Sequence, residues 1–539
     1  MINHANDLSQ GNAMKLRARL LWRDCLAAAG IILLLVCVSV SGIRSRDIDT
    51  PDSGMHLMDG YFIHDLLHDH PLIHIYGYTL GYYKQYPALG FMFWPPLFSV
   101  VLGIFSFFGG PHVLTARICI LFFGGVFALS FYTILRRQFS SLLSFSATAA
   151  AVATTGIAWS FNEVMLELPA LAMMCLAILA YYRLVDSLDR EQPRAARALL
   201  CAAACAAVIY TKQPAWFLYG ALLADFLASH RRHFSNPQVW IAVGATAVFC
   251  LPLAIFTLTY GRANLAQSVG SNTKLIMSSY GSLPRWSVGA WMYYPRLAVP
   301  SLSVIVLLAG LCALVLAALT RPFLRANALW VAWFVLAYAT FSFYDNRQAR
   351  FSIFWWPSWI FLSAAFLQVL TNRISTRVAW LMPLLLLAPL PFQIHQAWGA
   401  NYAEFSQERP AVVNLFAHGN PGNILLFGRD AQVFIALIRE SDAARVTHAI
   451  RGNRALKAGR GIEAACRMYR IGVVFVELPG TESVDQQSGL ADLNDPRSFR
   501  QLDDNTFIRI GVPYRIVTYR YLGPVDVQMA EAPLSSGAF

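Results

Sequence analysis

The sequence predicts a polytopic α-helical membrane protein with a soluble α/β domain at its C-terminal end. Of its 539 residues, 57% are hydrophobic and only 13% are charged, whereas about a quarter of the residues in soluble proteins are charged. The apolar residues form continuous runs and do not alternate as they do in β-barrel strands. Spanning segments must then be helices, which satisfy their backbone hydrogen bonds internally. From about residue 401 the runs shorten and the composition becomes that of a soluble domain.

The net charge of +12 comes from basic residues in short clusters between the apolar runs. This pattern is typical of cytoplasmic loops, and it does not indicate nucleic-acid binding. Eight of the nine cysteines fall in or beside apolar runs, and no CxxC pair occurs. Neither disulfides nor a zinc site is therefore indicated.

The N-terminus, residues 1–24, is predicted to be cytoplasmic because Lys15, Arg17, Arg19 and Arg23 precede the first span. That span covers about residues 25–43, and no small-residue cleavage site follows it, so we interpret it as uncleaved. The polar segment 44–96 then lies outside as the first external loop. It holds five of the twelve histidines, and a loop of this length is more typical of a site than of a connector.

The transmembrane domain is expected to cover residues 25–395 and to cross the membrane about eleven to thirteen times, at ~20 residues a span. The apolar runs after the first loop are 98–109, 113–135, 142–160, 168–183, 198–210, 215–229, 239–260, 301–319, 328–343, 351–370 and 378–394. Arg136 and Arg137 would lie outside if the first two of these runs both crossed. We therefore expect residues 96–109 to form an incomplete helix.

Two further segments complete the predicted topology. Residues 261–297 form a second external loop, in which aromatic and basic residues alternate. Residues 401–539 form an extracytoplasmic α/β domain, with strands over 424–427, 473–476, 507–510 and 515–521 and helices over 431–440 and 453–470. No internal repeat is visible, which weighs against a transporter built from duplicated halves.

The first candidate for chemistry is Asp52, which follows the first span and precedes His56 and Asp59. A carboxylate close to hydrocarbon has a raised pKa and can take a proton from a hydroxyl group. An equally good alternative is that Asp52 caps a helix beginning near Ser53.

Cations at the predicted outer face are the second candidate, because an anionic leaving group such as a lipid phosphate needs fixed positive charge nearby. These cations are Lys84, Lys212, Arg347 and Arg350. The alternative is that they extend to lipid headgroups. The two arginines are the stronger candidates, since paired arginines are less expected on the outside.

Acids and histidines give weaker signals. Glu163 and Glu167 lie at another outer turn, and an acid close to hydrocarbon is costly and often functional, although a plain loop acid is as good an interpretation. His64 and His68 share a helical spacing of four, but the histidines lack a tight metal-ligand spacing. The sequence establishes no cofactor and leaves a divalent metal ion open.

The order of several motifs resembles the large membrane glycosyltransferases with the C-type fold, close to the bacterial dolichyl-phosphate-mannose–protein mannosyltransferase and aminoarabinose-transferase group. The matching residues are Pro51-Asp52, Tyr86-Pro87-Ala88-Leu89, Trp94-Pro95-Pro96-Leu97-Phe98, Glu167-Leu168-Pro169-Ala170-Leu171, Tyr210-Thr211-Lys212-Gln213-Pro214-Ala215, Arg350-Phe351 and Trp356-Pro357. The resemblance covers roughly residues 20–395. Three positions depart from the family: Ser53 stands where Glu is frequent, Trp94 where a basic residue often precedes Pro-Pro, and Glu167 where Asp is frequent.

The resemblance implies an inverting glycosyltransferase that moves a sugar from a polyprenyl phosphate to a lipid, glycan or protein acceptor. It would act at the extracytoplasmic face of a bacterial inner membrane. Asp52 would be the general base. The donor phosphate would bind Arg347, Arg350, Lys84 and Lys212, and the substrate cavity would include His56, Asp59, Glu163, Glu167, Tyr86 and Trp94.

Two alternatives remain open at this point. A transporter or flippase of lipid-linked glycans would need polar residues within the spans, which are nearly free of them; uptake without a glycosidic product would favour it. A non-catalytic scaffold would bind a partner through residues 401–539, and deleting them would abolish binding without an enzymatic phenotype.

Overall fold

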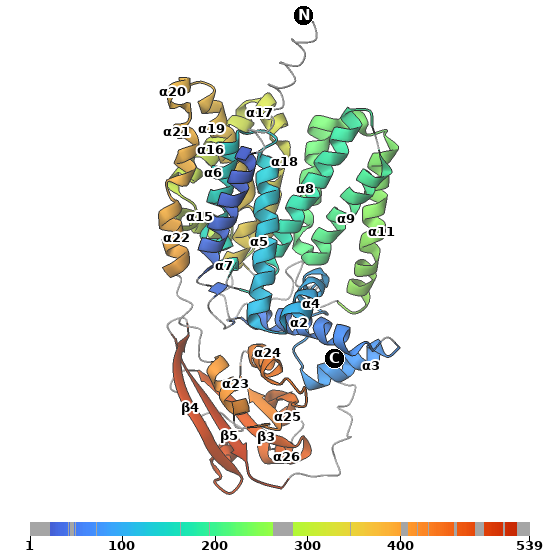
Figure 1. Cartoon of the computed structure of the whole chain (residues 1–539), viewed down its shortest axis with the longest axis vertical. Coiled ribbons are helices and arrows are strands. Elements are labelled where there is room, and N and C mark those ends of the chain that lie inside the picture. Colours follow the sequence, from blue (N-terminus) through green and yellow to red (C-terminus); the bar gives the residue numbers. More distant parts are fainter. Residues whose placement is uncertain are drawn as a thin grey trace, which may run out of the picture. The chain divides into compact units, whose positions relative to one another are not determined.

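The computed structural model describes residues 22–40, 42–43, 48, 50–71, 73–161, 163–192, 194–261, 284–344, 347–399, 408–417, 419–428, 431–457, 461–479, 490–509 and 512–524. It divides into two compact units (Figure 1). The helical unit comprises Met1–Gly42, Met92–Phe98 and Ile118–Ala400. The mixed unit comprises Ile43–Phe91, Ser99–Arg117 and Asn401–Phe539.

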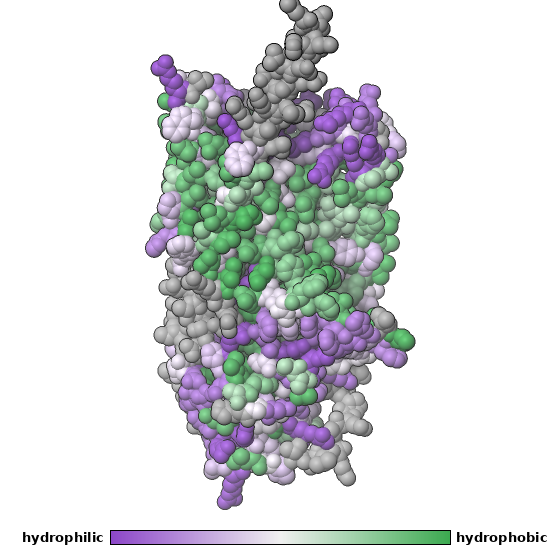
Figure 2. All heavy atoms as spheres, in the orientation of Figure 1, coloured by the Kyte–Doolittle hydropathy of each residue, from purple (hydrophilic) through white to green (hydrophobic). Residues whose placement is uncertain are grey.

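Apolar helices make up most of the helical unit. Among the described residues, five segments are long and apolar enough to cross a membrane: Trp22–Val40, α5 (Val113–Leu135), α8 (Glu167–Asp189), α11 (Pro237–Thr259) and Arg377–Trp398. Shorter apolar helices of this unit are α6 (Ser141–Val152), α9 (Ala195–Thr211), α16 (Val304–Leu319), α18 (Ala328–Phe343) and α19 (Trp356–Thr371). A further short apolar helix, α4 (Leu97–Gly109), belongs mostly to the mixed unit. On the face drawn in Figure 2, hydrophobic side chains form a continuous band over this bundle. The chain is thus a membrane protein, as predicted.

The remaining elements of the helical unit are short and connect or extend these helices. They are α7 (Thr155–Ser160), η1 (Gln213–Trp216), α10 (Phe217–Asp225), η2 (Phe226–His230), η3 (Arg231–His233), α14 (Val288–Trp291), α15 (Tyr293–Ser301), α17 (Arg321–Ala326), η4 (Ala349–Phe354), α20 (Thr376–Ala379), α21 (Leu381–Leu387) and α22 (Leu390–Gly399). Most of the second predicted external loop, residues 262–283, lies outside the described residues.

The expected span over residues 142–160 is interrupted. α6 ends at Val152 and α7 begins at Thr155, and between them the Thr154 hydroxyl donates a hydrogen bond to the Ala151 carbonyl at 2.9 Å. A threonine side chain that bonds the backbone in this way offers the chain an alternative to the helix ladder. α4 has 13 residues and at 1.5 Å per residue spans about 20 Å, less than the ~30 Å hydrocarbon core. This length agrees with the expected incomplete helix.

Close packing of α16 on α19 supports η4, the turn that precedes α19. A Cβ atom at Gly310 would lie 2.2 Å from the Trp359 ring nitrogen, so only glycine allows this approach. That nitrogen donates a hydrogen bond to the Val306 carbonyl at 3.0 Å. Beside it, the Trp330 and Phe361 rings stack with centroids 4.0 Å apart. α16 and α18 thus pack closely against α19, the helix that follows η4.

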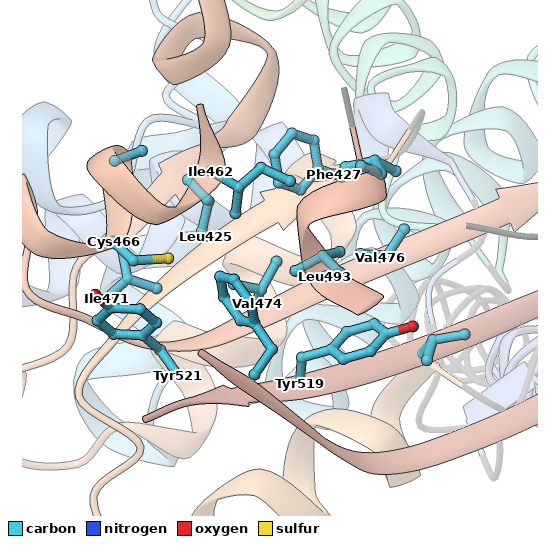
Figure 3. Packing of buried hydrophobic residues seen from close by; sticks show 14 of the residues in the cluster. Leu425, Phe427, Ile462, Cys466, Ile471, Val474, Val476, Leu493, Tyr519 and Tyr521 are labelled. Atoms are coloured by element: carbon cyan, nitrogen blue, oxygen red, sulfur yellow. The ribbon is translucent and has the colours of Figure 1, made fainter. Parts of the chain in front are cut away.

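The mixed unit contains a five-stranded sheet in the order β2-β1-β3-β5-β4. Its strands are β1 (Asn423–Phe427), β2 (Ala449–Arg451), β3 (Ile471–Pro479), β4 (Phe499–Arg509) and β5 (Val512–Tyr521). β1 pairs in parallel with β2 and β3, whereas β5 runs antiparallel to β3 and β4. Leu425, Val474 and Tyr519 of the sheet pack against Ile462 and Cys466 (Figure 3). The predicted α/β domain is confirmed.

The prediction of the C-terminal elements was wrong in three details. It missed β2, which has only three residues. It placed one helix over residues 453–470, but α25 (Gly452–Lys457) and α26 (Ile462–Met468) are separate, because Gly461 with φ −47° and ψ 170° starts α26 anew. It recognised only the end of β4, whose first half is mostly polar.

The segment predicted as the first external loop forms helices that belong to the mixed unit. They are α2 (Pro51–Asp69) and α3 (Ile75–Gln85), with α4 following. α2 packs on α24 (Ala431–Ser441) of the C-terminal domain. A second helix of that domain, α23 (Glu408–Ala417), also contacts α24. The 3₁₀ turn η7 (Ala491–Asn494) completes the unit. The loop and the C-terminal domain, more than 300 residues apart in the chain, thus fold together.

Candidate functional site

A buried charge cluster lies in the helical unit, where Glu167, Lys212 and Arg350 meet. The Lys212 ammonium donates a hydrogen bond to Glu167 Oε1 at 2.7 Å, and Arg350 Nε lies 3.4 Å from the same oxygen. The side chain of Glu167 is 1% exposed, that of Lys212 is 4% exposed and that of Arg350 is 11% exposed. Buried charges of this kind persist only when they are paired. Three of the residues expected from the sequence are therefore brought together.

Helix ends place these three side chains. Glu167 is the first residue of α8, where the helix dipole favours a carboxylate. Lys212 follows the last residue of α9 in an extended conformation, with Pro214 just beyond it in η1; the dipole favours a cation at this end. Arg350 lies in the 3₁₀ turn η4. All three are thus held by backbone whose conformation is well determined by local sequence.

Aromatic rings enclose the ammonium group of Lys212. It lies 5.7 Å from the ring centre of Trp94, 5.3 Å from that of Phe351 and 5.9 Å from that of Phe354. The Arg350 guanidinium lies 5.4 Å from the Phe351 ring. Ring faces attract cations within about 6 Å, so these rings hold the positive charge without neutralising it.

Two cations approach the same carboxylate oxygen in this cluster. Glu167 Oε2 makes no hydrogen bond within the described part of the chain. Arg350 Nη1 lies 3.3 Å from the Met165 sulfur. Glu163, two residues before that methionine, is also buried. Fixed cations in a dry site bind an anion such as a phosphate strongly.

Arg347 is buried beside the same turn, and its Nε donates a hydrogen bond to the Ser342 carbonyl at 3.0 Å. Its neighbours 345 and 346 lie outside the described residues. Lys84, by contrast, is exposed in the last turn of α3, in the mixed unit.

Asp52 lies in the first turn of α2 and is half-buried. The residue that caps this helix is Thr50, whose hydroxyl oxygen accepts a hydrogen bond from the Ser53 backbone at 3.2 Å. The alternative that Asp52 is the cap is therefore wrong. Its carboxylate is not needed to close the helix, although the helix dipole still favours its charge.

His56 and Asp59 follow Asp52 at spacings of four and seven, which place all three on one side of α2. Both His56 and Asp59 are fully buried. Asp59 Oδ1 accepts a hydrogen bond from the Gly90 backbone at 2.7 Å. Burial raises the pKa of Asp59 well above its usual value, because desolvation disfavours the charged form.

Tyr86 takes part in the packing between the loop and the C-terminal domain. It is buried, and its hydroxyl donates a hydrogen bond to Asp442 Oδ2 at 3.0 Å. Trp94, the other aromatic residue expected in the cavity, belongs to the helical unit, where it faces Lys212.

Sequence reasoning missed two ion pairs in the mixed unit. Arg439 donates hydrogen bonds to both oxygens of Asp65, at 2.6 and 2.9 Å, and Arg445 does the same for Asp69, at 2.6 and 2.7 Å. The hydrogen bond from Arg445 holds the pKa of Asp69 below its usual value. Burial opposes ionisation of Asp65, but hydrogen bonds from His64 and Arg439 outweigh it and lower its pKa. The repeated His-Asp pairs 64–65 and 68–69 were the available signal.

No group of three or more His, Cys, Asp or Glu side chains with metal-binding geometry occurs among the residues that the structure describes. His64 and His68 do share one helix face, with stacked rings 6.4 Å apart. Each of them contacts the aspartate that follows it, at 2.8 and 3.0 Å.

The fold is similar to that of membrane glycosyltransferases with the C-type architecture, and the predicted resemblance is confirmed. Residues 94–256 match the family model described as dolichyl-phosphate-mannose-protein mannosyltransferase. A search of curated proteins finds no match.

Among solved structures, the chain is similar to ArnT from Cupriavidus metallidurans bound to undecaprenyl phosphate, with 13% identity and a TM-score of 0.58, over 94% of this chain and 99% of that one. The apo state of that protein matches with 13% identity and a TM-score of 0.55, over 91% and 98%. The Archaeoglobus fulgidus oligosaccharyltransferase tethered with an acceptor peptide matches with 12% identity and a TM-score of 0.52, over 84% and 69%.

Proposed function

We propose that this protein is an inverting glycosyltransferase that takes a sugar from a polyprenyl-phosphate carrier at the extracytoplasmic face of a bacterial inner membrane. The acceptor is a hydroxyl group of a lipid, glycan or protein. Residues 401–539 lie on the same side of the membrane in this proposal.

The observation that carries the proposal is the charge cluster of Glu167, Lys212 and Arg350. A departing lipid phosphate gains negative charge at the moment the sugar leaves. Fixed cations that face this charge in a water-poor site stabilise the transition state most. The cluster supplies two such cations, which lie 2.7 and 3.4 Å from one oxygen of Glu167. The similar protein ArnT was crystallised with undecaprenyl phosphate, a ligand of this class.

The proposed reaction is a single displacement at the anomeric carbon. Asp52 takes the proton of the acceptor hydroxyl, and the oxygen forms a bond to the anomeric carbon. The bond from that carbon to the phosphate oxygen breaks, and the electron pair leaves with the polyprenyl phosphate. One displacement inverts the configuration. Lys212, Arg350 and Arg347 receive the phosphate.

The other residues of the proposed site shape and tune it. Trp94 holds Lys212, and His56, Asp59, Glu163 and Tyr86 line or support the substrate cavity. Lys84 is a further phosphate contact in this proposal.

The test compares membranes from cells that carry the wild-type protein, the deletion, or Asp52→Asn. Mass spectrometry of envelope lipids and glycans defines the product as the species lost in the deletion. We expect Asp52→Asn to abolish this product while native mass spectrometry still detects binding of undecaprenyl phosphate.

Glu463→Gln is the matched control, since Glu463 also lies in the first turn of a helix, α26, and should leave the product unchanged. Near-normal product from Asp52→Asn refutes the assignment of the base. Uptake of a lipid-linked glycan by vesicles without any glycosidic product refutes the enzyme altogether.

A further inference from the structure

Helix α2 meets the C-terminal domain at a point two residues after Asp52. A Cβ atom at Gly54 would lie 2.6 Å from the backbone carbonyl atoms of Gln432 and 2.8 Å from the backbone nitrogen of Val433, both in α24. The contact is with backbone, which cannot turn aside as a flexible side chain could. Only glycine permits α2 and α24 to cross this closely.

The same side of α2 continues the contact with α24. At about 100° per residue, Gly54, Tyr61 and Asp65 fall within about 40° of one another around the helix. All three are buried. Asp65 is 1% exposed and its partner Arg439, in α24, is 5% exposed. A double hydrogen bond between two buried charges fixes the rotation of α2 about its axis as well as its position.

Asp52 lies on the other side of α2. Its direction differs from that of Gly54 by about 160° around the helix, and that of His56 differs by a similar angle. The C-terminal domain therefore holds the side of the first two turns that is opposite to Asp52.

Further contacts fasten the end of α3 and the segment after it to the same domain. Gln85 Nε2 donates hydrogen bonds to the backbone carbonyls of Arg445 and Thr447, at 2.6 and 3.2 Å. Arg451 Nη2 donates one to the Pro87 carbonyl at 2.7 Å. The loop is thus attached along its length and not at a single point.

We propose that the C-terminal domain is a positioning element for the reaction, with Gly54 and Arg439 as the residues that set the placement of the Asp52 turn. The inference rests on the proposed role of Asp52. A general base acts only within hydrogen-bond reach of its proton, and a displacement of about 1 Å can cost a hundredfold in rate. Helix α24 holds α2 rigidly enough to prevent such a displacement. The domain then acts on turnover and not on binding of the lipid donor.

The test uses the full-length protein with Gly54→Ala and, as its matched control, Gly77→Ala. Gly77 is also a helical glycine of the loop, in α3, but a Cβ atom there meets nothing within 4 Å. We expect Gly54→Ala to lower product formation at least tenfold and to raise hydrogen exchange over residues 50–60. Binding of undecaprenyl phosphate should stay within threefold of wild type. Gly77→Ala should match wild type in all three measurements.

The inference is overturned if Gly54→Ala forms product within threefold of wild type. It is also overturned if donor binding falls by the same factor as product formation, because that result would indicate general damage to the protein. If Gly54→Ala cannot be recovered from membranes, the test uses the double variant Asp65→Asn/Arg439→Gln, which removes the ion pair without adding volume. The same limits on product formation, hydrogen exchange and donor binding then apply to it. Asp52→Asn separates the two proposals. Full activity of that variant refutes Asp52 as the base, whereas the exchange data still report whether α24 holds α2.

Discussion

Replacing Lys212 by methionine removes one of the two cations at Glu167 but keeps most of the side-chain volume. At an effective dielectric constant of about 20, unit charges 2.7 Å apart attract by about 6 kcal/mol and charges 3.4 Å apart by about 5 kcal/mol. Most of this gross attraction offsets the cost of removing the charges from water. Breaking a buried pair typically costs about 3–5 kcal/mol. Because Arg350 still faces Glu167, we expect Lys212→Met to destabilise the protein by about 2–3 kcal/mol.

The assay is unfolding of the purified protein in mixed detergent–SDS micelles, followed by tryptophan fluorescence. Lys84→Met serves as the stability control, because this exposed lysine should change the unfolding free energy by less than about 0.5 kcal/mol. Glu167→Gln should also destabilise, since it leaves Lys212 and Arg350 facing each other. The double variant Lys212→Met/Glu167→Gln should cost less than the two single changes together, as residues in direct contact are not additive. Strict additivity, or a Lys212→Met variant as stable as wild type, would refute the pairing.

Two further predictions concern the mixed unit. Arg445 holds the pKa of Asp69 below its usual value. The contribution of Asp69 to stability is therefore present above the unfolded pKa of about 4 and is lost as the pH falls from there toward the lower folded pKa. Protection of residues 60–69 from hydrogen exchange, measured relative to the intrinsic rate at each pH, should fall between pH 5 and pH 3, and Asp69→Asn should remove part of that dependence. Thr50→Ala removes the cap of α2 and should destabilise its first turn by about 1 kcal/mol. This loss should be visible as faster hydrogen exchange at residues 51–55. Thr50→Ser keeps the hydroxyl oxygen and should leave the exchange unchanged.

Features with a long or strongly periodic sequence signal were predictable. The predicted apolar run 168–183 lies within a single helix, Glu167–Asp189, in the structure. Counting spans and basic loops also put Lys212, Glu167 and Arg350 on the same side of the membrane, and the structure brings these three side chains into contact. Charged residues near hydrocarbon are few, so those present are expected to pair with one another.

Contacts between distant segments were not predictable in the same way. Asp65 and Arg439 are 374 positions apart, and nothing local in either segment indicates the other. The sequence of α24 is amphipathic. This pattern predicts that one side of the helix is buried, but it does not identify the helix that covers that side. Short elements such as β2 cannot be predicted for a related reason, because three residues are too few to show a periodic pattern of apolar side chains. The role of the first loop as part of the C-terminal unit could therefore emerge only from three-dimensional contacts.

Trp94 departs from the pattern that the resemblance implies, and its ring packs beside a cation of the cluster. The resemblance predicts a basic residue at this position, and a cation there would lie beside Lys212. Here the tryptophan ring faces the Lys212 ammonium at 5.7 Å and attracts it. The Lys212 side chain is thus held at a defined place by the Trp94 ring and by its hydrogen bond to Glu167.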